Sequence, residues 1–158
     1  MSQRDELSSR QVRDELLAAW RDRHPTQQRT NAMTKAELYV QHLEQEGYKP
    51  RIDEDNDVIF KFEGMTLVLS NDDEDTPFFR LLLPNFWEIE SEEEQQALRA
   101  MNAVNARLKV LKLVLVRGHV WASVELFFDP FETFKSVFTR SVRLVLQGAK
   151  EFRDEMNP

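Results

Sequence analysis

The clearest pattern of apolar and polar positions lies between residues 108 and 128, and it is interrupted at Arg117-Gly118. Two runs rich in β-branched residues on either side of a Gly-containing turn are typical of a β-hairpin. A two-residue turn there would pair Leu115 with Val120, Leu113 with Ala122, Leu111 with Val124, Val116 with His119, Val114 with Trp121 and Lys112 with Ser123. The first three pairs give one entirely apolar face. A slip of one residue would mix the two faces, so the pattern favours this register.

A second hairpin is predicted between residues 57 and 70, with its turn at Glu63-Gly64. This register pairs Phe62 with Met65, Phe60 with Leu67, Val58 with Leu69 and Lys61 with Thr66, which again makes one face apolar. A further strand is expected over Phe78–Leu83, ended by Pro84.

Three helices are predicted around these strands. The first begins at a capping box, Thr34 to Glu37, and ends at Gly47, and the second begins at a similar box, Ser91 to Glu94. The second helix would turn Leu98, Met101, either Val104 or Asn105, and Leu108 inward. The last helix would begin at Asp129-Pro130, and its apolar stripe would cover a sheet: Phe131, Phe134, Phe138, Val142, Val145, Ala149 and Phe152.

An additional amphipathic helix is expected over about residues 9–23, followed by a polar linker. This helix either docks on the remainder of the chain or binds a partner. We therefore divide the chain into an N-terminal helical extension and linker, residues 1–32, and a domain of residues 33–158. The predicted domain is α+β, a five-stranded antiparallel sheet with packed helices in the order α-βββ-α-ββ-α.

Composition narrows the possible functions. The 158 residues include no cysteine, which excludes disulfides, thiolate zinc sites and a cysteine nucleophile. Only four glycines are present, and no phosphate-binding loop or dinucleotide fingerprint occurs. No segment has the length of apolar residues that a membrane span needs, so we expect a cytoplasmic protein that does not contact membranes.

Charge is distributed unevenly along the chain. The net charge is −7, and residues 34–99 carry 6 basic and 17 acidic side chains, which disfavours nucleic acid as a partner. Residues 100–158 carry 9 basic and 6 acidic ones. On the last helix, Arg140, Arg143, Gln147 and Lys150 share one side, which is either a contact for an acidic partner or a solvated surface.

Candidate chemistry is sparse. The run Asp53–Asp57 resembles the start of a calcium loop, but Val58 stands where that loop needs glycine and Gly64 where it needs glutamate. None of the three histidines has the spacing of a metal ligand or a marked catalytic base. We expect no catalytic residue, no metal and no cofactor. A metal-binding or enzymatic domain that uses the acidic turns is the weakest alternative.

Some apolar residues lie outside the faces that the predicted core would bury. Val114 and Trp121 lie on the second face of the hairpin, and Val137 and Leu144 widen the stripe of the last helix. Surplus apolar surface is typical of interfaces. These four residues are our candidates for a partner or dimer interface.

The order of elements resembles the YbjN family, described as bacterial sensory transduction regulators. The similarity covers about residues 33–156 and is clearest in Leu98–Asn105, where Asn102 and Asn105 end the middle helix, in the Lys-bearing strand 109–116, and in Val124-Glu125-Leu126. The family's fold is similar to that of class I type III secretion chaperones, which are acidic homodimers that wrap an extended effector segment. The N-terminal helix departs from this pattern.

The resemblance implies a non-enzymatic protein that acts through protein–protein contact, as a homodimer with an unidentified protein partner. The leading hypothesis is a YbjN-like regulator, and the alternative is a dedicated chaperone for a secreted client.

Overall fold

Both predicted β-hairpins are present with the predicted registers. The first joins β2 (Val58–Phe62) to β3 (Met65–Leu69), and the second joins β5 (Leu111–Val116) to β6 (His119–Phe127). Both residues of each turn have positive φ, 48° and 81° in the first and 49° and 80° in the second. Positive φ at both positions is type I′ geometry, which matches the twist of the flanking strands and therefore fixes the register.

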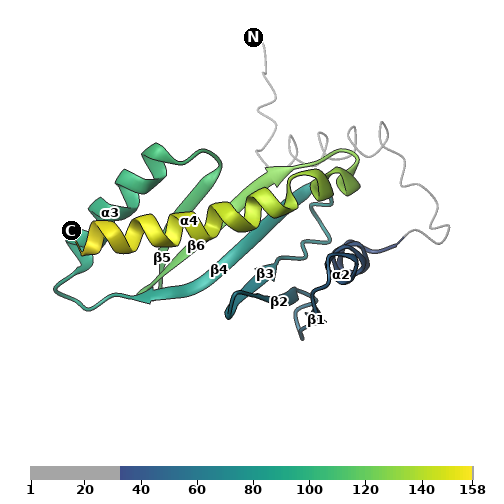
Figure 1. The fold of residues 1–158 in the computed structure, drawn as a ribbon, viewed down its shortest axis with the longest axis horizontal. Coiled ribbons are helices and arrows are strands. Elements are labelled where there is room, and N and C mark those ends of the chain that lie inside the picture. The colour runs from purple at the N-terminus through teal and green to yellow at the C-terminus, as the bar shows by residue number, and fades with distance from the viewer. Residues whose placement is uncertain (1–32, 158) are drawn as a thin grey trace, which may run out of the picture. The chain divides into compact units, whose positions relative to one another are not determined.

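The computed structural model describes residues 33–157, and the helix predicted over residues 9–23 lies outside them. Residues 33–157 fold as α+β around a six-stranded antiparallel sheet in the order β1-β2-β3-β4-β6-β5 (Figure 1). The expected count of five strands is wrong because β1 (Arg51–Ile52) adds an edge strand beside β2. Two residues are too few to show alternation.

The strand expected to end at Leu83 continues through Pro84 as β4 (Phe78–Glu88). Its pairing with β6 is interrupted between Leu83 and Trp87, where Asn85 adopts a φ of +50°. Proline is tolerated at such an irregularity because no ladder N–H is needed there. The proline therefore marks a bulge in the strand and not its end.

The helices confirm one of the three predicted helix starts and contradict two. In α2 (Lys35–Gln45), the backbone N–H of Glu37 donates to Thr34 Oγ1 at 3.2 Å and the Thr34 N–H donates to Glu37 Oε2 at 2.7 Å, so the box forms. The Ser91 box does not form, since α3 (Glu94–Arg107) begins three residues later without a side-chain cap. After Pro130 the chain forms a 3₁₀ helix, η1 (Phe131–Ser136), and α4 (Phe138–Met156) begins only at Phe138.

The core lies between the sheet and its helices. The predicted stripe of η1 and α4 is buried except for Phe131, which is partly buried, and α4 contacts β4, β5 and β6. In α3, Met101 and Val104 point inward as expected. Leu98 does not, and it is 48% exposed, because Ala97 and Ala100 occupy the inward positions instead.

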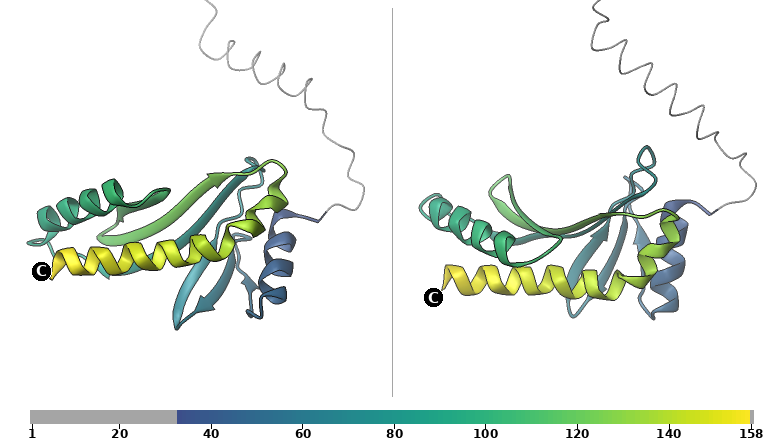
Figure 2. Two further views of the ribbon diagram at one scale, coloured as in Figure 1. Left: turned by 45° about the horizontal axis from the view of Figure 1, so that its top comes forward. Right: turned by 90° about the horizontal axis from the view of Figure 1, so that it is seen from above.

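We call the sheet face that packs on these helices the inner face, and the opposite one the outer face. Along β2, β3 and the first half of β4 the buried residues alternate with less buried ones, so that the outer face carries the second set. In β6, Ser123 of the outer face is buried as well. Among residues 33–157, α2 and α4 pack on the inner face and α3 lies beside α4 and β5 (Figure 2). No helix of the described residues covers the outer face.

Candidate functional site

Val114 and Trp121 face each other across β5 and β6 on the outer face, as predicted. Both side chains are half-buried. The indole Nε1 of Trp121 donates a hydrogen bond to Asn85 Oδ1 at 2.8 Å. Because Asn85 belongs to the irregular part of β4, the bulge that follows Leu83 also fixes the orientation of the tryptophan ring.

Further apolar side chains continue across the outer face. Ile59 pairs with Val68, and Val68 pairs with Leu82, so three neighbouring strands contribute one row. At the far end of β4 and β6, the rings of Phe78 and Phe127 lie 5.5 Å apart, and Phe127 is 71% exposed. We call these residues, together with Val114 and Trp121, the outer apolar surface: Ile59, Val68, Phe78, Leu82, Val114, Trp121 and Phe127.

Charged groups lie among these apolar side chains. Lys112 and Glu125 form an ion pair at 3.2 Å, and the Ser123 hydroxyl donates to the same carboxylate at 3.1 Å. The Arg80 guanidinium lies 5.7 Å from the centre of the Phe78 ring. Exposed pairs of this kind contribute little to stability. Their charges instead lie between the Val114/Trp121 pair and the Phe78/Phe127 pair, so the outer face offers a partner both apolar and polar contacts.

Val137 and Leu144 lie in a different place. They line a groove of about 560 Å³ between α4 and the segment that leads into β5, on the helix side of the sheet. We call it the α4 groove, and it is lined by Arg107, Leu108, Lys109, Val110, Val124, Leu126, Val137, Arg140, Ser141, Arg143, Leu144 and Gln147. The four predicted interface residues therefore belong to two separate surfaces.

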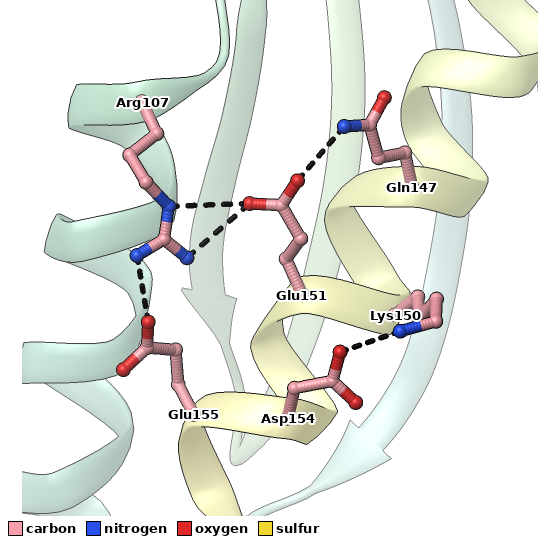
Figure 3. A network of polar contacts seen from close by, with 6 residues as sticks. All are labelled: Arg107, Gln147, Lys150, Glu151, Asp154 and Glu155. Carbon is pink, nitrogen blue, oxygen red and sulfur yellow. Dashed lines mark hydrogen bonds and ion pairs between the residues drawn. The ribbon is translucent and has the colours of Figure 1, made fainter.

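One end of the α4 groove is held by a polar network (Figure 3). Arg107, the last residue of α3, donates to Glu155 at 2.7 Å and to Glu151 at 3.2 and 3.3 Å. Gln147 donates to the other oxygen of Glu151 at 2.8 Å. Several charges and amides in contact restrain one another more than an isolated surface pair does, so the network keeps α3 and α4 in fixed relation beside the groove.

The outer edge of β5 is covered by Asn105 at the end of α3. The Leu113 N–H donates to Asn105 Oδ1 at 2.8 Å, and Asn105 Nδ2 donates to the Leu113 carbonyl at 3.2 Å. The amide thus occupies a donor and an acceptor that an added strand would use. The sequence drew attention to this asparagine only as a possible inward position of the helix and as part of the Leu98–Asn105 pattern.

One buried polar residue of α2, Lys35, was not identified from the sequence. Lys35 Nζ donates to the carbonyls of Asp75 at 3.1 Å, Asp72 at 3.4 Å and Phe78, and lies 4.8 Å from the Phe131 ring centre. Burial lowers the pKa of this lysine, while neighbouring carboxylates, Asp72 first, oppose that shift. Its helical spacing gave no sign of this contact because the carbonyls come from a distant loop.

The acidic turns use their carboxylates within the fold. Asp53 Oδ1 accepts the N–H groups of Asp55 and Asp57, both at 3.0 Å, and Asp72 Oδ1 accepts those of Glu74 and Asp75. Such Asx-type contacts are a structural use of aspartate. Within residues 33–157, no three His, Cys, Asp or Glu side chains converge as a metal site would require.

No helix among those residues has the length and apolar character that a membrane crossing requires.

Comparison with known proteins identifies one family. The model of the family described as T3SS (YopN, CesT) and YbjN peptide-binding chaperone 1 matches residues 32–157, which include every element described above. No curated protein matches the chain. The resemblance that the sequence pattern predicted is thereby confirmed.

Proposed function

The chain belongs to the T3SS (YopN, CesT) and YbjN peptide-binding chaperone 1 family, and from this premise we propose that it is a non-enzymatic, cytoplasmic protein that binds a segment of another protein on its outer apolar surface. The observation that carries the proposal is the position of Trp121. Its ring is held by Asn85 on a sheet face that no helix of residues 33–157 covers.

Trp121 is suited to anchor a partner. Tryptophan is enriched among the few residues that dominate binding energy, because a large ring loses little conformational freedom on contact. The hydrogen bond to Asn85 reduces that freedom further before any partner arrives. The neighbouring Val114 and the row Ile59, Val68 and Leu82 supply apolar contact over several strands, enough to follow an extended segment.

Two physiological roles fit such a binding surface. The first is the sensory transduction regulator expected from the YbjN resemblance, acting through contact with a protein partner. The second is a dedicated chaperone for a secreted client, which the description of the family as peptide-binding chaperones favours. Co-purification of one abundant protein would distinguish the chaperone from the regulator. A metal-binding or enzymatic domain that uses the acidic turns is the weaker alternative, because Asp53 and Asp72 each use Oδ1 to accept backbone hydrogen bonds within their turns.

A homodimer is part of the proposal. Light scattering of the full chain at micromolar concentration tests it, and we expect the mass of two copies. If the dimer contact uses the outer apolar surface, Trp121→Glu converts the dimer to a monomer. A dimer that persists in this variant places the contact elsewhere.

Affinity capture tests the binding function. The wild-type chain, Trp121→Glu and the control Thr66→Glu serve as baits in extracts of the cells that make the protein, with mass spectrometry as the readout. Thr66 is exposed on the outer face outside the apolar surface, so its variant adds the same charge without touching the anchor. We expect a partner retained by wild type and Thr66→Glu but lost from Trp121→Glu. Equal recovery by all three baits contradicts the proposed surface.

A further inference from the structure

The α4 groove has the composition of a second binding site, and we propose that it takes an acidic, apolar segment of a partner protein. This inference goes beyond the proposed function. The groove lies on the helix side of the sheet, whereas Trp121 lies on the outer face. The groove and the outer apolar surface share no residue, so each site can be tested separately.

The walls and floor of the groove are apolar. Val137 immediately precedes α4, Leu144 lies in its second turn, and Val124 and Leu126 come from β6. Its volume of about 560 Å³ is within the range of sites that enclose a small ligand or several side chains. Apolar side chains of a partner would therefore lose part of their contact with water there.

Cationic groups surround this apolar interior. Lys109, Arg140 and Arg143 line the groove and are exposed, and within residues 33–157 none of them has a carboxylate within 4.0 Å. Arg107 differs, since it is paired with Glu151 and Glu155. Three such cations around one groove contrast with a chain whose net charge is −7.

This charge pattern indicates which kind of ligand is complementary to the α4 groove. Arginine pairs with carboxylates through two parallel hydrogen bonds, so a segment with glutamate or aspartate beside apolar residues complements both rim and interior. Nucleic acid fits poorly, because its phosphates would meet the acidic remainder of the protein and its backbone offers nothing to the apolar floor. We therefore infer that the ligand of the α4 groove is an acidic, apolar peptide segment.

The backbone at the mouth of the groove supplies an independent observation. Val110 lines the groove, has a φ of +68° and is 49% exposed. A β-branched residue rarely adopts the left-handed region, and such strain is typical of functional positions. A half-exposed valine contributes little to folding at this φ, whereas contact with a bound apolar side chain would explain it.

Fluorescence anisotropy with a short fluorescein-labelled peptide of alternating leucine and glutamate tests the inference on the full chain. We expect binding that weakens with salt, and loss of at least about tenfold in affinity when glutamine replaces glutamate or in Arg140→Glu/Arg143→Glu. Leu144→Ala should also weaken binding. Arg99→Glu is the matched control, because Arg99 is an exposed cation of α3 outside the α4 groove.

The outcomes separate this site from the outer apolar surface. Binding that survives Trp121→Glu but not Arg140→Glu/Arg143→Glu supports the groove. Loss in Trp121→Glu alone, equal affinity for the glutamine peptide, or absence of binding to wild type overturns it. Dissociation of a dimer by Arg140→Glu/Arg143→Glu, without any effect on the peptide, would instead make the groove a contact between two copies and would also overturn the inference.

Discussion

The side chain of Asn105 forms two hydrogen bonds with the backbone of Leu113, one as acceptor at 2.8 Å and one as donor at 3.2 Å. A side-chain amide thus takes the place of a neighbouring strand along the outer edge of β5, the last strand of the sheet. Exposed strand edges tend to pair with other chains, so the last turn of α3 protects this edge.

Removal of this amide should therefore be costly. Asn105→Ala leaves the N–H and carbonyl of buried Leu113 without these partners, and we expect a loss of about 1–3 kcal/mol in the free energy of unfolding. Chemical denaturation measures it. Asn102→Ala is the control, since Asn102 is exposed three residues earlier on the same helix and should change stability by less than about 0.5 kcal/mol. Equal losses in both variants would contradict the edge-covering role.

At Gly148, α4 packs so closely against Leu111 of β5 that helix propensity alone does not predict the effect of a substitution. A Cβ at this position would lie 2.3 Å from Leu111 Cδ2, because α4 passes close to β5 there. Propensity alone predicts that Gly148→Ala stabilises the helix by about 1 kcal/mol. We expect the opposite, a loss of about 1–3 kcal/mol from overpacking.

A double-mutant cycle checks this explanation. In the Leu111→Ala background the obstructing side chain is absent, so Gly148→Ala should no longer destabilise the protein. The free energies of unfolding of the four proteins give the coupling. If Gly148→Ala costs the same in both backgrounds, the contact with Leu111 is not the cause.

His42 should make stability depend on pH. Its ring is buried edge-on against Phe134 and Phe138, at 5.4 and 4.8 Å between ring centres. Burial lowers its pKa below the ordinary 6.5, Glu46 of the same helix counteracts the shift, and Lys135 of η1 adds to it. The unfolded chain therefore takes up a proton first as the pH falls.

The expected result is full stability above pH 6.5 and a progressive loss as the pH falls below 6.5 toward the lowered pKa of the folded state. Denaturation across this range measures it. His42→Phe keeps an aromatic ring between the two phenylalanines and removes the titrating group, so its curve should be flatter. The same slope in both proteins would assign the pH dependence to other groups.

Val110 should be a position where stability and binding oppose each other. Glycine adopts a φ of +68° without the steric cost that valine has, so Val110→Gly should raise the free energy of unfolding by about 1 kcal/mol. Val110→Ala removes the side chain but keeps Cβ, and it should gain less. Thermal unfolding distinguishes the two. A destabilised Val110→Gly would show that the valine is not strained.

The sequence predicted those parts of the fold whose geometry is set by near neighbours. Each hairpin register follows from a turn of two residues and from the alternation beside it, and the buried stripe of α4 follows from its helical period. By contrast, β1 is recognisable only through its pairing with β2, and β4 passes Pro84 only because β6 continues beside it. These depend on contacts between distant residues.

The candidate site was predictable to a similar extent. Alternation identified Val114 and Trp121, and helical spacing identified Val137 and Leu144, but neither could show that the two pairs lie on different sides of the sheet. The role of Asn105 depends on how α3 packs against β5, which no local pattern contains.

The most direct test of the central claim is the affinity for the partner segment recovered in the capture experiment. Calorimetry of that segment with wild type, Trp121→Glu and Thr66→Glu should give a dissociation constant at least about tenfold larger for Trp121→Glu, equivalent to about 1.4 kcal/mol. Thr66→Glu should match wild type, and all three proteins should keep the same circular dichroism spectrum. Equal affinity of folded Trp121→Glu and wild type would contradict binding at the outer apolar surface.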